Sequence, residues 1–444
     1  MKMKEFEYTF VDELAKGLRQ WQDISAVNKS LVVCRNAVPG PMGLKGFEDF
    51  EQAVSGVTIS WPFPQLVSGG KIMVLGYASE LYEVESDWSV TSVLSGITTG
   101  DHWDLVNIGD YVIGTNGGAM VVRDVSTGAW SQSSGSNSLP LVRSLCNYKG
   151  QLVGGGVLSS FNGCDESFVV WSKIGSADFT VDRMNTAGFA PMYQVGDILR
   201  VGTLGDYVVV YGTRGIVAMR GVVEPAPTLM YRDIQSNGIR SVGAVGFGEG
   251  EHVFVDNDNI MWKIGSELGL EMLGYEEFMS SLGDGINVAY KRGSGEFYVS
   301  DGSKCYLLNK FGMCQVHQLV TSVADDISKA VWESDGDEEF EVKTDLVDFY
   351  IQGLKSVQLL EFMFEGSDEA YARLDFRYTS GGAYQNLGWK RLNKENIATF
   401  ITHGTQFRFG FKCDTREGVR LSGLRARVKL SDKRGIRGMY SNAS

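Results

Sequence analysis

The stretch GDYVVVYGTRGIVAMR at residues 205–220 decides the fold of this chain. A Gly-Asp turn precedes a run of β-branched and aromatic residues, and a second glycine-containing turn separates it from another apolar run. Two short apolar runs joined by a tight turn predict a β-hairpin, because glycine accepts the positive φ that such turns need. Comparable pairs recur, and the second residues of their opening turns are 70, 110, 150, 206, 251 and 296.

The spacing of these turns is 40, 40, 56, 45 and 45 residues. A repeat of roughly 40–50 residues with about four short strands is typical of a β-propeller. Because one blade cannot bury both faces of its sheet alone, blades stack around an axis. We therefore predict an all-β chain with a propeller of five to seven blades, and an insertion at 161–182 in the longest interval.

Composition excludes several other classes of protein. Of the 444 residues, 55 are glycine and only 8 are proline, whereas disordered linkers are usually rich in both. No apolar run approaches the ~20 residues that span a bilayer. The opening MKMKEFE lacks the apolar segment of a secretory signal, so we expect the protein to be made and kept in a cytosol. The six cysteines are scattered and lack zinc-ligand spacing, which predicts buried, reduced thiols.

The last hundred residues follow a different pattern. They begin after an acidic, glycine-containing run at 333–339, which we interpret as a solvated linker or turn. Beyond it, Phe407, Phe409 and Phe411 alternate with other residues, so one face of the predicted sheet is buried and the other is wet. This period-2 pattern predicts a C-terminal β-sandwich.

The expected organisation has three parts. They are an N-terminal arm with the first strands at 1–55, the β-propeller at 56–340 and the β-sandwich at 341–444. Apolar residues at roughly helical spacing also predict two helices, at 11–22 and at 270–282.

Charge is distributed unevenly along the chain. The net formal charge is −13, yet residues 343–444 hold 17 basic and 11 acidic residues and so carry +6, which leaves −19 on residues 1–342. Basic residues alternate with apolar ones on three predicted strands and share one wet face if these strands are neighbours. They are Arg373, Arg377, Arg408, Lys412, Arg425, Arg427 and Lys429. We predict that this basic face is an inter-subunit interface that meets acidic surface on a neighbouring subunit, and a merely solvated face is the alternative.

The sequence offers no set of residues typical of an enzyme. His102, His252, His317 and His403 lack a short metal-binding spacing, and there is neither a G-x-S-x-G elbow nor a Walker loop. The Asp-Asn-Asp-Asn run at 256–259 resembles the start of a calcium loop, but a β-turn is the better interpretation. We therefore predict no catalytic residues, no cofactor and no metal. Carboxylates and arginines of the kind that glycosidase propellers use are abundant, so a glycosidase stays an open alternative.

Several segments stand out by their order along the chain. They are Leu31–Asn36 with the following Gly43-Leu44, Val170–Gly175 with Asp178-Phe179, Gly205–Gly212 continuing to Gly238-Ile239, the expected helix at 270–282, and Leu421–Arg427. This ordered set resembles the tail hub or nozzle proteins of short-tailed bacteriophages, also called packaged-DNA stabilisation proteins.

The resemblance implies a structural virion protein and not an enzyme. Proteins of this family form a ring, usually a hexamer, below the portal and adaptor rings, where they extend the DNA channel and hold packaged DNA until ejection. Tail fibre or needle proteins commonly attach to them. The resemblance thus implies a place in the virion tail, assembly in the host cytoplasm, and double-stranded DNA that passes without sequence-specific binding. An acidic 1–342 region suits such a conduit, since negative walls repel phosphates.

Two other functions fit the sequence. A phage fibre or receptor-binding propeller, with or without glycan-cleaving activity, would be a trimer and, if an enzyme, would gather carboxylates and arginines at the propeller mouth. A cytosolic propeller unrelated to phages would bind protein partners. The oligomeric state separates these functions, because a hub forms a closed ring.

Overall fold

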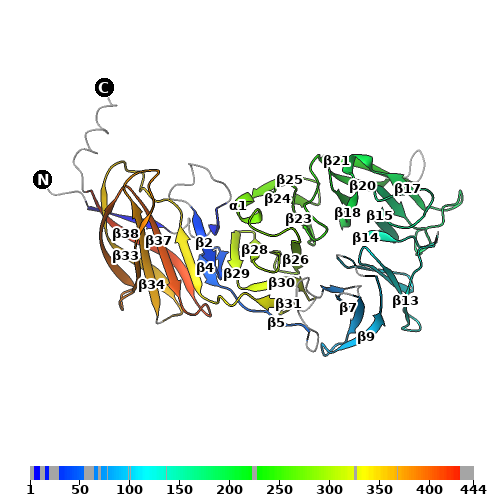
Figure 1. Cartoon of the computed structure of the whole chain (residues 1–444), viewed down its shortest axis with the longest axis horizontal. Helices are drawn as coiled ribbons and strands as arrows, with labels where there is room; N and C mark the ends of the chain where they lie inside the picture. Colours follow the sequence, from blue (N-terminus) through cyan, green and yellow to red (C-terminus); the bar gives the residue numbers. More distant parts are fainter. Residues whose placement is uncertain are drawn as a thin grey trace, which may run out of the picture. The chain divides into compact units, whose positions relative to one another are not determined.

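The chain divides into two compact units, here called the propeller unit (Phe50–Ser303 and Leu319–Glu333) and the sandwich unit (Met1–Asp49, Lys304–Gln318 and Ser334–Ser444). Regular structure in both is almost entirely β-strand (Figure 1). This computed structural model describes residues 5–10, 16–19, 30–54, 65–68, 72–77, 79–98, 100, 102–136, 138–222, 228–324, 328–367 and 369–430.

The described part of the propeller unit contains five four-stranded antiparallel sheets, in which consecutive strands pair in chain order. Blade 1 comprises β6 (Gln65–Ser68), β7 (Met73–Tyr77), β8 (Glu80–Val84) and β9 (Val90–Ser95). Blade 2 comprises β10 (Asp104–Ile108), β11 (Tyr111–Thr115), β12 (Met120–Asp124) and β13 (Trp130–Gln132). Blade 3 comprises β14 (Val142–Tyr148), β15 (Gln151–Val157), β16 (Phe168–Trp171) and β17 (Gly188–Pro191).

Blades 4 and 5 repeat this arrangement. Blade 4 comprises β18 (Ile198–Leu204), β19 (Tyr207–Gly212), β20 (Ile216–Val222) and β21 (Thr228–Gln235). Blade 5 comprises β22 (Val245–Phe247), β23 (Glu251–Val255), β24 (Met261–Gly265) and β25 (Leu270–Gly274). The 3-10 helix η3 (Tyr193–Val195) precedes blade 4. The antiparallel hairpin of β26 (Asn287–Lys291) and β27 (Glu296–Ser300) follows blade 5 and forms blade 6 of this unit.

Blade 7 is built from both sides of the repeat. It contains β30 (Gln318–Val323), β31 (Lys329–Ser334) and β5 (Glu51–Gln52), a strand that precedes blade 1 in the chain. β5 pairs in parallel with β31, and the Gln52 amide donates to the Trp332 carbonyl oxygen at 2.8 Å. A strand from the N-terminal side therefore completes the last blade, which leaves fewer unpaired edges.

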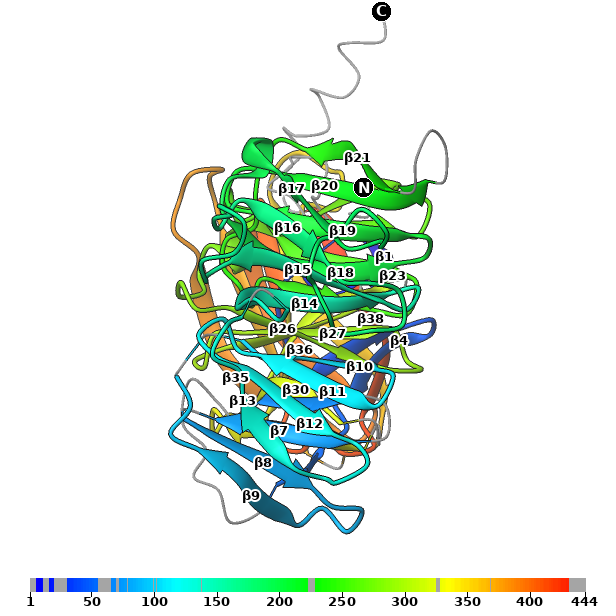
Figure 2. The same cartoon turned by 90° about the vertical axis from the view of Figure 1, so that its right-hand side faces the viewer.

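The first strands of the seven blades surround one axial cavity, to which β6, β10, β14, β18, β22, β26 and β30 all contribute lining residues. Neighbouring blades contact one another through these inner strands, and Figure 2 shows blades 1 to 4 stacked in sequence order. The predicted β-propeller is thus present, and the described residues place seven blades around the cavity, the upper end of the predicted range.

Apolar side chains fill the space between blades. Val106 of blade 2 packs in one cluster with Leu152 and Phe168 of blade 3. The predicted insertion joins this cluster, because Phe161 and Phe179 are both completely buried in it. Burial of each such side chain contributes roughly 1.5–3 kcal/mol. The β-branched and aromatic runs of the repeat therefore form the faces on which blades stack.

The predicted helix at 270–282 is wrong. Its first residues form β25, and only the four residues of α1 (Glu276–Met279) are helical. Between the two elements, Gly274 and Tyr275 have φ angles of 80° and 61°. Two consecutive left-handed residues turn the chain and prevent a continuous right-handed helix. The other predicted helix, at 11–22, lies outside the described residues except for 16–19.

The sandwich unit contains two sheets. The first runs in the order β3-β4-β38-β33-β36, and β1 also pairs with β38. Its strands are β1 (Glu5–Phe10), β3 (Ala37–Gly40), β4 (Gly43–Gly46), β33 (Lys355–Glu365), β36 (Ile397–Gly404) and β38 (Arg420–Leu430). Within this unit the second sheet runs β28-β29-β2-β32-β37-β34-β35. Its strands are β2 (Leu31–Arg35), β28 (Cys305–Asn309), β29 (Gly312–Val316), β32 (Phe340–Thr344), β34 (Ala370–Arg377), β35 (Gln385–Arg391) and β37 (Gln406–Cys413).

Phenylalanine rings join the two sheets. The Phe411 ring of β37 lies 5.0 Å from the ring of Phe362 and 5.0 Å from that of Phe364, both on β33, between centroids. Phe407 and Phe409 on the same strand are also buried. The alternation at 407–411 therefore marks the inner face of a sheet, as predicted, and the sandwich core is aromatic.

The unit boundaries depart from the expected parts at 1–55, 56–340 and 341–444. Strands β1 to β4 of the expected arm belong to the sandwich unit, where β4 pairs with β38 and β2 with β32 (Figure 1). The hairpin β28–β29 joins the same unit, since β29 pairs in parallel with β2. Strands from three stretches of sequence complete these sheets because unpaired edges need partners.

Candidate functional site

The axial cavity of the propeller unit has a volume of about 480 Å³. This size falls within the range of small-ligand pockets. Its lining mixes apolar side chains with polar ones, among them Arg200, Asp104, His102 and Asn287. These polar side chains come from different blades. The hydrogen-bond partners of each side chain show whether it is free to act on a ligand or is used to hold the blades together.

Asp104 and Arg200 form the centre of a buried polar network. The Arg200 Nη2 donates to Asp104 Oδ1 at 2.8 Å, and its guanidinium lies 4.8 Å from the Phe247 ring centroid. The second carboxylate oxygen, Asp104 Oδ2, accepts from Ser144 Oγ at 2.5 Å and from the Leu145 amide at 3.1 Å. The side chains of Arg200 and Asp104 are 4% and 11% exposed, so the pair lies in a low-dielectric interior. Burial lowers the pKa of Arg200, and Asp104 opposes this effect.

A β-bulge directs Arg200 into this network. The pairing of β18 with β19 shifts register between Ile198 and Arg200. Such an extra residue bends a strand and re-aims the side chains beside it. Arg200 Nε and Asn287 Oδ1 are buried atoms to which no protein group in the described residues hydrogen-bonds, and ordered water is the usual partner of such atoms.

The two histidines of the propeller unit, the buried His252 and the half-buried His102, have structural partners. His252 Nε2 lies 3.0 Å from the Thr203 carbonyl oxygen, which can only accept, so this nitrogen carries the proton. Its Nδ1 then accepts from the Tyr211 hydroxyl at 2.9 Å. Burial lowers the pKa of His252 to about 4, so the ring is neutral at pH 7. His102 Nδ1 lies 3.2 Å from the Gln65 amide nitrogen, and burial, followed by the charge of Arg200, lowers its pKa as well.

The run at 256–259 is a turn between β23 and β24, as interpreted from the sequence. Asp256 Oδ1 accepts from the backbone amides of Asp258 and Ile260 at 2.9 Å each, and its Oδ2 accepts from the Trp262 indole at 2.8 Å. The carboxylate is thereby used to hold the turn. Among the described residues, no group of three His, Cys, Asp or Glu side chains is placed to hold a metal ion.

The seven predicted interface residues do not share one face. Arg373, Arg377, Arg408 and Lys412 lie on the paired strands β34 and β37, whereas Arg425, Arg427 and Lys429 lie on β38 in the other sheet. The assumption that all three strands are neighbours is therefore wrong. Alternation within a strand fixes which residues share a side, but it does not reveal which sheet the strand joins.

Most of these cations have partners within the sandwich unit. Arg373 pairs with Asp375 at 2.7 Å, and Lys412 pairs with Glu339 at 2.8 Å. On the other sheet, Arg425 pairs with Glu361 at 3.2 Å. The remaining contacts are Arg377 to Gln406, Arg408 to Asp345, Arg427 to Glu7, and Lys429 opposite Glu5 in the strand register. The positive charge is thus partly balanced inside the subunit, and Arg425 and Arg427 keep side chains that are 38% and 44% exposed.

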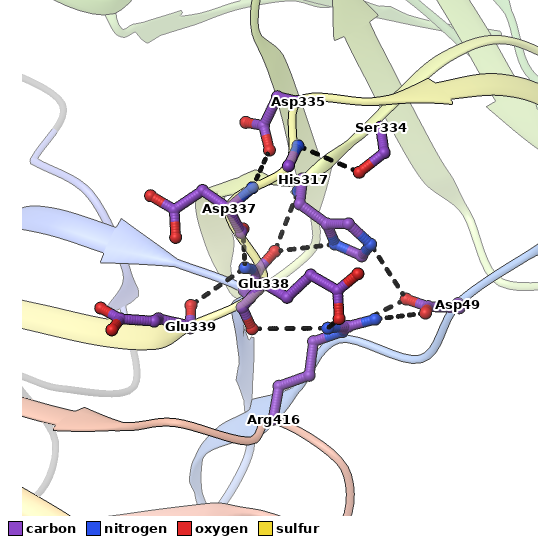
Figure 3. Close-up of polar contacts among 10 residues, drawn as sticks. Asp49, His317, Ser334, Asp335, Asp337, Glu338, Glu339 and Arg416 are labelled. Atoms are coloured by element: carbon purple, nitrogen blue, oxygen red, sulfur yellow. Dashed lines mark hydrogen bonds and ion pairs between the residues drawn. The ribbon is translucent and has the colours of Figure 1, made fainter.

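Sequence reasoning missed one polar cluster in the sandwich unit, here called the His317 clasp (Asn36, Asp49, His317, Glu338 and Arg416; Figure 3). The Arg416 guanidinium donates to the Asp49 carboxylate and, at 3.0 Å, to Glu338. The acidic run at 333–339, interpreted from the sequence as a solvated linker or turn, is held to the sandwich unit by several of its side chains. Besides the Glu338 contact, Asp337 pairs with Arg35, and Glu339 pairs with Lys412. The clasp residues are far apart in the sequence, so no local sequence pattern predicts that they form a cluster.

Comparison with known proteins gives matches in structure alone. No known family matches the sequence, and no curated protein does either. PorZ, an essential surface component of the type-IX secretion system of Porphyromonas gingivalis, is 10% identical with a TM-score of 0.37 over 66% of this chain and 36% of PorZ. This chain thus matches about a third of the length of PorZ. BamB from Moraxella catarrhalis is 12% identical with a TM-score of 0.35 over 65% of this chain and 90% of BamB. Hsv2 from Kluyveromyces lactis is 7% identical with a TM-score of 0.30 over 61% of this chain and 98% of Hsv2.

Proposed function

We propose that this chain is a structural subunit of a bacteriophage tail, a hub or nozzle that forms a closed ring, extends the DNA channel below the portal and adaptor rings, and retains packaged DNA until ejection. The proposal starts from the ordered segments that resemble this family. It includes virion location, assembly in the host cytoplasm, and attachment of tail fibre or needle proteins.

The places of the resembling segments support a scaffold role. In the Val170–Gly175 segment, the Trp171 indole donates to the Thr186 carbonyl oxygen at 2.9 Å and the Ser172 amide donates to that of Leu152 at 2.9 Å. The Gly238-Ile239 pair lies where blade 4 leads into blade 5, and the Ile239 amide donates to the Gly212 carbonyl oxygen at 3.1 Å. These residues hold strands and turns together, which is what a rigid ring subunit requires.

One observation carries the choice of a scaffold over a glycan-cleaving propeller. Among the described residues that line the axial cavity, Asp104 is the single carboxylate, and both its oxygens are engaged by Arg200, Ser144 and the Leu145 amide. Most glycosidases need two carboxylates on either side of the scissile bond. A buried, fully engaged carboxylate instead ties inner strands together.

The experiment that tests the proposal is electron microscopy of the purified protein and of tails that contain it. We expect a closed cyclic ring, with six subunits as the first expectation, coaxial with the DNA channel. A trimer would favour the fibre or receptor-binding alternative, and hydrolysis of a glycan panel would then be measured. A protein that stays monomeric at micromolar concentration and is missing from virions would contradict the proposal.

A further inference from the structure

One face of the second sandwich sheet concentrates positive charge. Strands β2, β32, β34, β35 and β37 together carry eight lysines and arginines but only two acidic residues. On β37, Arg408 and Lys412 alternate with the buried phenylalanines of the strand, so they lie on the side away from the sandwich core. β34 pairs with β37 and places Arg373 and Arg377 on the same side. Four cations of two neighbouring strands therefore share this face.

The carboxylates near this face do not cancel its charge. Asp375 is shared by two cations, Arg373 and Lys343. Asp345 is likewise shared by Arg408 and a second arginine. The side chains of Arg373 and Arg408 are both 29% exposed, so a ligand in solution can reach them. The face therefore keeps an excess of accessible positive charge.

Two aromatic rings lie among these cations. The ring centroid of Tyr384, just before β35, lies 4.3 Å from the guanidinium carbon of Arg408 and 4.7 Å from that of Arg377. The second ring is that of Trp389 on β35, and both aromatic residues are half-buried. We define the cation–aromatic face as Arg373, Arg377, Arg408, Lys412, Tyr384 and Trp389.

The Trp389 side chain lies along the sheet. Its strand is separated from β37 by β34, yet a Cβ atom at Gly410 on β37 would lie 3.1 Å from Trp389 Cη2. Neighbouring strands are about 4.8 Å apart, so the side chain reaches Gly410 only by lying across β34. The ring centroid is 5.9 Å from Arg373 Cζ and 5.5 Å from Lys412 Nζ. Trp389 is thus an aromatic platform on the sheet with two cations beside it.

We propose that the cation–aromatic face binds single-stranded nucleic acid without sequence preference. Bases stack on Trp389 and on the arginine planes, and the phosphates lie against the cations, a combination that single strands use on many proteins. Flat sheets with aromatic side chains serve as such platforms. An acidic protein surface would use the cations and not the rings, and duplex DNA would offer phosphates but no free base faces. This inference does not depend on the proposed function.

Fluorescence anisotropy of the full chain with a labelled oligothymidylate of about 16 nucleotides tests the proposal. We expect binding at about 50 mM salt that weakens as salt is added, and weaker binding of heparin and of a duplex of the same length. Trp389→Ala should lower the affinity about tenfold through lost stacking, whereas Trp389→Phe, which keeps a ring, should lose less. Lys45→Gln, which removes a half-exposed cation of the other sheet, is the matched control and should bind as the wild type. Absence of binding, equal binding of heparin or duplex, or unchanged affinity in Trp389→Ala would overturn the proposal.

A second variant covers the case in which Trp389→Ala does not fold. Lys412→Gln removes one contact to phosphate, so the plot of log affinity against log salt concentration should become shallower by about 0.7, the value for one contact with a single strand. Lys45→Gln should leave this slope unchanged. The same slope in Lys412→Gln and the wild type would contradict the proposal. If the oligonucleotide does not bind and Lys412→Gln weakens ring assembly, the face instead meets an acidic surface of a second copy of this chain.

Discussion

Asp104 and Arg200 are bonded at 2.8 Å although they belong to blades 2 and 4, which are not neighbours. The inner strand of blade 3 lies between them and takes part through Ser144, whose Oγ donates to Asp104 and accepts from the Val201 amide at 3.0 Å. Three inner strands are thereby held at fixed spacing around the axial cavity. A buried polar network of this kind holds the strands that it links in fixed positions, and ordered water is the usual partner of an atom such as Arg200 Nε that no protein group contacts.

Breaking this pair should destabilise the propeller unit. Asp104→Asn leaves the buried Arg200 without its counter-charge, and loss of one partner of a buried ion pair costs about 3–5 kcal/mol. Urea unfolding of the variant and the wild type measures the difference. Asp206→Asn is the matched control, because it breaks an exposed pair with Lys149 that also links two blades, and it should leave unfolding unchanged. Similar midpoints for the two variants would contradict the structural role of Asp104.

Stability should depend on pH through His252. Its pKa is about 4 in the folded protein and ordinarily 6.5, so between these values the unfolded chain binds more protons than the folded one. The contribution of His252 is therefore complete above about pH 6.5 and is lost as the pH falls to about 4, by on the order of 3 kcal/mol. His252→Gln should show a shallower fall of melting temperature between pH 7 and pH 4.5, and His403→Gln should not. A fall as steep in His252→Gln as in the wild type would assign the effect to other groups.

Gly238 should tolerate no side chain. A Cβ atom there would lie 2.2 Å from the Gly212 carbonyl oxygen, which accepts from the Ile239 amide. Gly238→Ala forces this backbone apart, and overpacking of this kind costs about 1–3 kcal/mol. Gly250→Ala serves as the control, since a Cβ at Gly250 meets nothing within 4 Å. Thermal unfolding of both variants tests this prediction, and we expect a lower melting temperature for Gly238→Ala than for Gly250→Ala. Equal melting temperatures would show that the backbone between blades 4 and 5 can relax around the added methyl group.

Charge reversal on β38 tests the predicted interface. Arg425→Glu with Arg427→Glu should weaken ring or tail assembly while the subunit still folds, because the two side chains are half-exposed and their pairs contribute at most about 1 kcal/mol each. Particle assembly and the melting temperature of the isolated subunit are measured together. The control is Arg391→Glu with Lys394→Glu, which reverses two exposed charges elsewhere in the sandwich unit. Normal tails from the β38 variant would mean that this surface is only solvated.

Local sequence patterns predicted the features that depend on neighbours in the chain. The run at 207–211 and its turn became β19 and the hairpin of blade 4, since turn chemistry and alternation act within a few residues. The helix expected at 270–282 failed because a strand and one helical turn can place apolar residues at the same spacing. In the sequence, Gly274 is the residue that indicates this break. The positive φ of the neighbouring Tyr275 arises from packing, because tyrosine does not favour the left-handed conformation.

Features that depend on distant pairing could not be predicted. Nothing near Arg425 or Arg408 tells which sheet each strand joins, so residues on two sheets were assigned to one face. The His317 clasp needs Asn36, His317 and Arg416 to meet, and they are 281 residues apart for the first pair alone. Likewise, the pairing of β2 with β32 moved most of the expected N-terminal arm into the sandwich unit.

The pairing of β1 with β38 has a consequence for biosynthesis. Glu5 lies opposite Lys429, so the first described strand waits for a partner that the ribosome makes more than 400 residues later. At about 5–20 residues per second, this delay lasts tens of seconds. Blades 1 to 5 can form meanwhile, because each of them pairs its own consecutive strands. A nascent chain that stops before β38 therefore leaves β1 without its partner strand, and an unpaired strand of this kind is prone to aggregation.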